Sequence, residues 1–184
     1  MKTCINLGSG NSYRESNTVE KWINIDKNRK CRADYYLDLE KDKIPCKTST
    51  ADYILMRHFF EHIRNIDHLM NECWRVLKHG GTLHIISPYW TNQWSVGDPT
   101  HVRSVTENTF MFFDKVVMEK CIKEKKVMTV VCPKCDFVQQ EVKMHLPSEW
   151  LDKHEKNPDE VKFAMKHYLN VVEEIEFYLR ARKK

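Results

Sequence analysis

The chain has 184 residues, a length that suits one domain with a substantial hydrophobic core. Hydrophobic residues make up 41% and charged residues 30%, with a net charge of +4, which is an ordinary composition for a soluble protein. No apolar run approaches the roughly 18 residues that a membrane span needs, and no secretion signal is present at the start. We therefore expect a cytoplasmic protein. Its seven cysteines, an odd number, do not fit a secreted disulfide framework.

Short apolar runs between polar turns predict five strands in the first half of the chain. They cover residues 3–7, 22–26, 33–39, 52–56 and 83–87. A short polar helix is expected after the first strand. Asn65 is the predicted N-cap of a second helix, which carries apolar residues at helical spacing and stops at Gly80-Gly81.

The second half predicts a loop over 88–104, a helix from about 106 to 120, and a hairpin of strands 127–131 and 137–144. One long helix is expected over 158–182. Strands that alternate with helices predict an α/β fold, with a mostly parallel sheet and an antiparallel hairpin at one edge. We expect one domain over residues 1–184, with its core at about 3–145 and a C-terminal helical extension at about 147–183.

Polar or glycine residues follow four of the predicted strands, at the ends where open α/β sheets bind ligands. The first is Gly8-Ser9-Gly10, a turn in which glycine permits a positive φ or a close approach to a ligand. Asp26 ends the second strand, where a carboxylate can accept hydrogen bonds from ribose hydroxyls. Asp38-Leu39 ends the third strand, and residues 56–59 follow the fourth. Their order and spacing favour a nucleotide-like ligand.

On these motifs the chain resembles the class I S-adenosylmethionine-dependent methyltransferases, and within them the small type 11 group. The resemblance covers about residues 3 to 110 and rests on five segments. They are Leu7-Gly8-Ser9-Gly10, Ile23-Asn24-Ile25-Asp26, Asp38-Leu39 with Ile44-Pro45, Asp52-Tyr53-Ile54 with His58 and Glu61-His62, and Arg75-Val76-Leu77-Lys78-His79-Gly80-Gly81. Ser12 stands where many members have a third glycine, and His79 replaces a usual proline.

The resemblance implies a Rossmann-like methyltransferase fold and S-adenosylmethionine as cofactor. Gly8 and Gly10 would approach the methionine part of the cofactor, and Asp26 would hold its ribose. Asp38 and Leu39 would contact the adenine. The full set of expected cofactor-binding residues is Leu7, Gly8, Ser9, Gly10, Asp26, Asp38, Leu39, Arg57 and His58, with His58 near the sulfonium.

Methyl transfer from a sulfonium is a direct displacement, in which the protein aligns the acceptor and removes a proton where needed. The segment 98–103 is similar to a D-P-T-H-x-R segment in a subset of the family. It makes His101 and Asp98 the candidate catalytic residues. Further candidates are Glu61 and His58 as bases and Tyr89, Trp90 and Trp94 as pocket walls.

Our expectation for the class of molecule that receives the methyl group depends on a motif that the sequence lacks. The D/N-P-P-Y/F string of amino-methylating nucleic-acid enzymes does not follow the fourth strand. We therefore expect a small-molecule, sugar or lipid-precursor acceptor in preference to nucleic acid or protein. A methyltransferase-like domain that binds the cofactor as a scaffold or sensor is an alternative. A pyridine-nucleotide or flavin enzyme ranks lower, because the third glycine of G-x-G-x-x-G is missing.

Three further features of the sequence allow other interpretations: two possible metal sites and one possible contact between two copies of the chain. His58, Glu61 and His62 match the H-x-x-E-H string of zinc peptidases, a remote alternative. The second alternative is a zinc site, in which a C-x-x-C pair and two flanking residues would bind the ion. We favour a hairpin turn with reduced thiols over this zinc site. Its residues would be Cys121, Cys132, Cys135 and His145. The long C-terminal helix could be buried against the sheet or form a homodimer contact.

Overall fold

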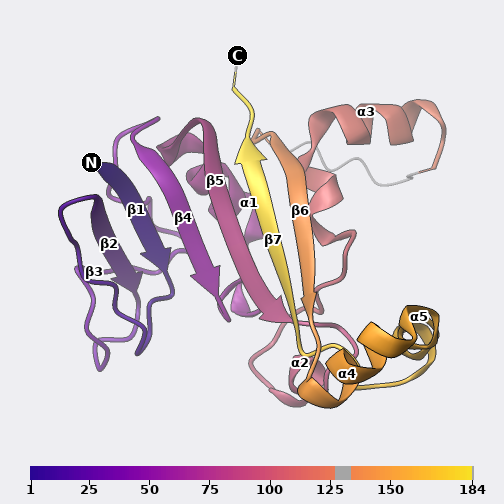
Figure 1. Cartoon of the computed structure of the whole chain (residues 1–184). Helices are drawn as coiled ribbons and strands as arrows, with labels where there is room; N and C mark the ends of the chain where they lie inside the picture. Colours follow the sequence, from indigo (N-terminus) through magenta and orange to yellow (C-terminus); the bar gives the residue numbers. More distant parts are fainter. Residues whose placement is uncertain (127–133, 184) are drawn as a thin grey trace.

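The computed structural model describes residues 1–126 and 134–183, and its centre is a seven-stranded sheet (Figure 1). The strand order is β3-β2-β1-β4-β5-β7-β6. The bounds are β1 Lys2–Leu7, β2 Glu20–Asp26, β3 Tyr35–Tyr36, β4 Ala51–Arg57, β5 Leu77–Pro88, β6 Phe137–His145 and β7 Glu174–Ala181. Strands β1 to β5 pair in parallel, whereas β7 runs antiparallel to both β5 and β6. The α/β class, the mostly parallel sheet and the antiparallel pair at one edge are confirmed.

Helix α1, Ile66–Val76, packs behind the sheet and was predicted closely. The Asn65 side chain accepts a hydrogen bond from the His68 backbone N–H at 3.2 Å, as an N-cap does. Leu69, Met70 and Cys73 are buried on one face of the helix against the sheet. Strand β5 begins directly after the helix, earlier than predicted, because Leu77 already pairs with Ala51 of β4.

The segment between β5 and β6 contains several short helices in place of one. They are α2 Gln93–Gly97, the 3-10 helix η2 Thr109–Phe113 and α3 Lys115–Lys123. The predicted helix over 106–120 is therefore wrong. Asp114 interrupts it, because its side chain accepts hydrogen bonds from the N–H groups of Val116 and Val117 and so starts a new helix.

The predicted long C-terminal helix is wrong. Residues 147–167 form two short helices, α4 Ser148–Lys156 and α5 Pro158–His167, at the end of the sheet where the parallel strands stop (Figure 1). The chain then returns as β7, in which alternate residues Ile175, Phe177 and Leu179 are buried. The spacing of these residues matches one face of a helix only loosely. β-Branched and aromatic residues such as Ile175 and Phe177 suit a strand that is buried on one face. The helix proposed as a dimer contact therefore does not exist in this form.

Three further predictions differ from the structure or fall outside its described residues. Strand β3 has two residues in place of the expected seven, and residues 8–19 contain no helix. The expected strand 127–131 lies outside the described residues. The antiparallel pair is thus made by β6 and β7, which are connected through α4 and α5. Within the described part of the chain, no helix is long and apolar enough to cross a membrane.

The two faces of the sheet differ in character. One face packs Ile54, Leu83 and Phe177 into the core with α1 and η2. The opposite face carries a hydrogen-bonded polar network centred on the Glu176 carboxylate. It accepts hydrogen bonds from Tyr178 Oη at 2.6 Å and from His84 Nε2 and His145 Nε2, also at 2.6 Å each.

Replacing Glu176 with glutamine is expected to destabilise the fold by about 2–4 kcal/mol at pH 7, because the amide cannot accept all three hydrogen bonds. Burial of the carboxyl opposes ionisation, but hydrogen bonds from Tyr178, His145 and His84 outweigh it and lower the pKa of Glu176 to about 2. A lowered folded-state pKa stabilises the protein above the unfolded-state value, and the gain is lost as pH falls toward 2. Urea denaturation at pH 7 and pH 3 should therefore show a smaller difference between wild type and variant at pH 3. An equal difference at both pH values would contradict this account.

Candidate functional site

A cavity of about 720 Å³ lies at the carboxyl ends of β1 and β2. Its lining includes residues from four of the segments that the sequence singled out. They are Gly8, Gly10, Asp26, Asp38, Leu39, His58 and His62, together with Leu37, Phe59, Ile63, Thr100 and Val102 among others. The volume falls in the range of about 300–1,000 Å³ that is usual for ligand pockets.

The glycine turn is held in place by Asp26. One carboxylate oxygen accepts a hydrogen bond from the Gly10 N–H at 2.8 Å, and the other accepts one from the Asn28 N–H at 2.7 Å. Gly8 and Gly10 have φ values of 65° and 46°, a region that favours glycine. A Cβ on Gly8 would lie 2.2 Å from the Phe59 ring, so the turn has no room for a side chain there. Asp26 therefore orders the turn and presents its remaining lone pairs to the cavity.

Asp38 and Leu39 form the far wall of this cavity. The Asp38 carboxylate accepts a hydrogen bond from the Glu40 N–H and lies 3.3 Å from Lys41 Nζ. The Glu40 N–H is the main cause that lowers the pKa of Asp38, so the group is ionised at neutral pH. Leu39 is buried and offers an apolar surface beside it.

Three other residues that the sequence predicted to bind the cofactor do not line this cavity. Leu7 and Ser9 are buried in and beneath the turn and are not among the lining residues, although the Ser9 hydroxyl has no hydrogen-bond partner among the described residues. Arg57 lies on the other face of the sheet, where it lines a smaller cavity with Trp22 and Tyr53. The reason is strand alternation, which places Arg57 and Tyr53 opposite to Met56.

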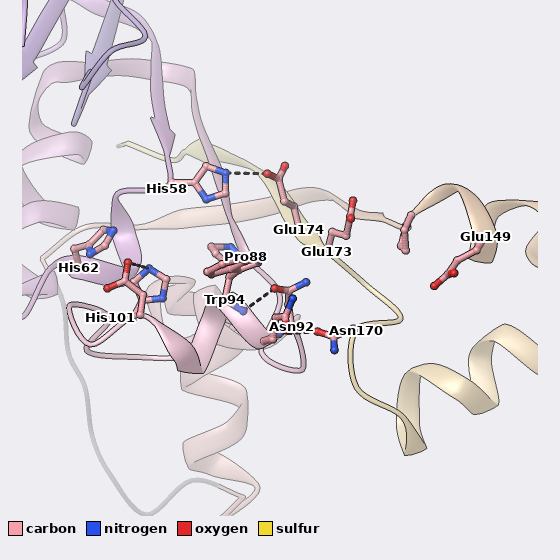
Figure 2. Close-up of a pocket in the computed structure, with 13 residues that line it drawn as sticks. His58, His62, Pro88, Asn92, Trp94, His101, Glu149, Asn170, Glu173 and Glu174 are labelled. Carbon is pink, nitrogen blue, oxygen red and sulfur yellow. Dashed lines mark hydrogen bonds and ion pairs between the residues drawn. The ribbon is translucent and has the colours of Figure 1, made fainter.

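A second cavity of about 660 Å³ adjoins the first, and His58 and His62 line both. Figure 2 shows His62 and His101 on one side of it, with Glu149 and Glu173 across from them. The lining residues are His58, His62, Pro88, Asn92, Gln93, Trp94, Asp98, His101, Pro147, Glu149, Asn170, Glu173 and Glu174. The last five come from the C-terminal third of the chain. No motif marked them, because their connection to the site depends on the return of the chain through α4, α5 and β7.

His58 stands at the junction of the two cavities with a φ of 48°. Its Nε2 is 2.8 Å from Glu174 Oε1, and its Nδ1 is 3.6 Å from Glu61 Oε1 (Figure 2 draws the first contact). The hydrogen bond to Glu174, followed by Glu61, raises the pKa of His58 to about 9. At neutral pH this ring is therefore a cation and a poor base.

His101 and Asp98 lie together on the loop after α2. His101 Nδ1 donates to the Ser95 carbonyl at 3.1 Å, and its Nε2 lies 3.7 Å from Asp98 Oδ2. Of the three aromatic residues expected as walls, only Trp94 lines the second cavity. Tyr89 is buried and donates its hydroxyl proton to Glu107, while Trp90 is not among the lining residues.

The two metal interpretations from the sequence find no support. His58 directly follows β4, and Glu61 and His62 belong to the 3-10 helix η1, Phe60–His62, whereas the peptidase string requires an α-helix. Of the four residues in the zinc interpretation, Cys132 lies outside the described residues. His145 is engaged with Glu176, and Cys135 is buried beside α1, where its N–H donates to Asn71.

One family model matches part of the chain. Residues 7–85 match the family model of the methyltransferase domain, type 11. No curated protein matches the sequence. A SAM-dependent methyltransferase from Archaeoglobus fulgidus has a similar structure, with a TM-score of 0.60, 15% identity, and coverage of 97% of this chain and 86% of that one.

Two further solved structures show the same fold. An S-adenosylmethionine-dependent methyltransferase from Mesorhizobium loti has a TM-score of 0.52 and 12% identity, with 96% and 90% of the two chains covered. The [4+2]-cyclase SpnF has a TM-score of 0.59 and 14% identity, with 100% and 76% covered. At these identities the likeness establishes the fold, and the family model matches residues 7–85, a little under half of the chain.

Proposed function

We propose that this chain, which carries a class I S-adenosylmethionine-dependent methyltransferase domain of the type 11 group, transfers a methyl group to a small-molecule acceptor bound in the second cavity. The observation that carries the proposal is the shared wall of the two cavities, where His58 and His62 line both. A cofactor in the first cavity and an acceptor in the second would meet at this junction. Such an arrangement supplies the alignment that a direct displacement needs.

The residues of the first cavity fit S-adenosylmethionine. Gly8 and Gly10 leave the backbone uncovered on the cavity side, and the Asp26 carboxylate has lone pairs left to accept ribose hydroxyls. Asp38 and Leu39 would hold the adenine between a charged hydrogen-bond acceptor and an apolar surface. When bound, the cofactor supplies the methyl group on its sulfonium.

The lining of the second cavity favours a neutral or positively charged small molecule. Four carboxylates line it, from Asp98, Glu149, Glu173 and Glu174, whereas no lysine or arginine belongs to the described lining. Nucleic-acid binding depends on lysine and arginine contacts to phosphates, so this lining disfavours it. A sugar, a lipid precursor or another small molecule with a hydroxyl or amine group suits it better.

His101 and Asp98 are the residues that we propose to contact the acceptor. The backbone carbonyl of Ser95 fixes the His101 ring, whose Nε2 then carries a lone pair that can accept a proton. The charged His58 cannot take this role, but its ion pair with Glu174 fixes the junction. The chain would therefore contribute mainly orientation and the exclusion of water.

A cofactor-binding scaffold or sensor is the second candidate. The similarity to a cyclase shows that this fold is compatible with chemistry other than methyl transfer. Calorimetry with S-adenosylmethionine combined with a screen for S-adenosylhomocysteine separates the two functions. We expect binding and product release with a pool of small amines and hydroxyl compounds. Binding without product from any pool would favour the scaffold, and product from nucleic acid alone would contradict the acceptor class.

For an acceptor that carries positive charge, Glu149→Lys is expected to raise KM about tenfold, because a lysine on the rim of the second cavity would repel it. The affinity for S-adenosylmethionine should not change. Glu155→Lys on the same helix is the matched control, since Glu155 is exposed and does not line the cavity. Steady-state kinetics of the two variants test this prediction, and an equal KM in both would contradict it.

A further inference from the structure

Three side chains beside the junction of the cavities lie close together: His62 lines both cavities, His101 lines the second, and Glu61 is buried next to them. Glu61, His62 and His101 each offer a ligand atom, and these atoms all lie within 4.8 Å of one another. Glu61 and His62 come from η1, whereas His101 comes from the loop after α2. The rings of His62 and His101 are 4.6 Å apart between centroids, edge to face (Figure 2).

Glu61 is buried with an incomplete set of hydrogen bonds. Its exposed fraction is 1%, and its Oε2 accepts a hydrogen bond from the Ser87 hydroxyl at 2.9 Å. Its Oε1 has no hydrogen-bond partner among the described residues, and His58 Nδ1 at 3.6 Å is too distant for one. The charged His58 ring offsets part of the cost of burying this oxygen, but Oε1 accepts no hydrogen bond and keeps lone pairs for a metal ion or a donor.

The hydrogen bonds around the two histidines determine which ring nitrogens are free. The Thr100 hydroxyl donates its only proton to Asp98 Oδ1 at 2.6 Å, because a carboxylate can only accept. Thr100 Oγ1 must therefore accept from His62 Nδ1, which lies 3.0 Å away. His101 Nδ1 likewise donates to the Ser95 carbonyl. In both rings the proton is on Nδ1, which leaves the lone pair of Nε2 free to bind a metal ion.

From this geometry we propose a binding site for one divalent transition-metal ion, held by Glu61, His62 and His101. Two imidazole nitrogens and one carboxylate oxygen are the donor set that Mn²⁺, Fe²⁺ and Co²⁺ accept. Thr100 and the Ser95 carbonyl supply the outer hydrogen bonds that usually orient metal-bound histidines. The set shares no residue with the cysteine-based zinc interpretation, and it uses His101 in place of His58 of the peptidase string.

The proposed ion deepens the methyl-transfer proposal and rests on it. Three protein ligands leave coordination positions open, and His62 lines both cavities. An acceptor hydroxyl could bind there, which would lower its pKa and hold its oxygen beside the cofactor cavity. The acceptor class would then be an alcohol: its oxygen takes the methyl group, S-adenosylhomocysteine leaves, and the hydroxyl proton passes to Asp98, whose Oδ2 lies 3.7 Å from His101 Nε2. With the ion bound, His101 holds the acceptor through the ion and does not act as the base.

The test is a titration of the chelator-treated full chain with Co²⁺, followed by calorimetry and by the visible absorption of the bound ion. We expect one Co²⁺ per chain without a thiolate-to-metal band. Glu61→Gln and His62→Ala should each weaken binding at least about tenfold. His154→Ala, an exposed histidine on α4, is the control and should bind as wild type does. Circular dichroism and thermal unfolding of each variant establish that it is folded.

A second pair of variants leaves all three ligands in place. Thr100→Val removes the hydroxyl that orients His62 and should weaken Co²⁺ binding about tenfold or more, whereas Thr100→Ser should restore it. The proposal is overturned if the wild type binds no Co²⁺, if a thiolate band appears, or if Glu61→Gln and His62→Ala bind normally. The affinity for S-adenosylmethionine is measured on the same samples. If no Co²⁺ binds but S-adenosylmethionine does, the metal site is overturned and the proposed methyl transfer stands.

Discussion

Replacing Gly8 with valine is expected to abolish measurable binding of S-adenosylmethionine, a loss of at least about 100-fold in affinity, or about 2.8 kcal/mol. The added Cβ would lie 2.2 to 2.8 Å from atoms of the Phe59 side chain, and Gly8 has a φ of 65°. A β-branched residue strongly disfavours that backbone conformation. The turn and Phe59 would both have to move, and both line the proposed cofactor cavity. Isothermal titration calorimetry measures the effect.

Two other glycines make this prediction specific. At Gly10 a Cβ would meet nothing closer than the Gly8 carbonyl oxygen at 4.0 Å, so Gly10→Ala should cost only the backbone strain of its φ of 46°, about 1–2 kcal/mol of stability. Gly97→Ala should change neither stability nor affinity appreciably, since that position has open space and lies outside the first cavity. Normal affinity in a folded Gly8→Val variant would refute the assignment of the first cavity to the cofactor.

Replacing Asp26 with alanine is expected to lower the affinity for S-adenosylmethionine by about 100-fold or more. The carboxylate accepts hydrogen bonds from the N–H groups of Gly10 and Asn28, and each bond to a charged group is worth about 1.5–3 kcal/mol. The variant loses both of these bonds and the proposed contacts to the ribose. The glycine turn would lose its order at the same time, so both stability and binding are expected to fall.

The matched comparison separates these two contributions. Asp26→Asn keeps one acceptor oxygen and should fall between wild type and alanine, whereas Asp159→Ala on α5, an exposed aspartate, should have no effect. Calorimetry gives the affinity and urea denaturation the stability. If Asp26→Ala loses stability but binds the cofactor as wild type does, Asp26 only supports the fold.

Helix α1 and strands β1, β2 and β4 in the first half of the chain were predictable because their signals are local. Asn65 caps α1 through its own side chain, and each parallel strand is a short apolar run that ends at a polar turn. The glycine turn after β1 and Asp26 after β2 meet for the same reason. Neighbouring parallel strands place their carboxyl ends at one edge of the sheet.

The secondary structure of the C-terminal third was predicted wrongly because its apolar pattern fits both a helix and a strand when the neighbouring strands are not known. The apolar residues from 171 to 181 can be read with a period near 3.6 or near 2, and only pairing with β5 and β6 selects the strand. The same pairing brings Glu174 to His58, more than one hundred residues away in the chain. The carboxylates of Glu173 and Glu174 in the lining of the second cavity therefore could not be found from a local motif.

By itself the sequence determined the class of fold and identified several residues that line the first cavity, among them Gly8, Gly10 and Asp26, because glycine turns, capping side chains and strand periodicity act over a few residues. The tertiary structure alone decided which face Arg57 occupies, how the chain closes the second cavity, and that Glu61, His62 and His101 meet. Those features depend on strand pairing across long stretches of chain and on the burial of charge. Short sequence patterns contain neither kind of information.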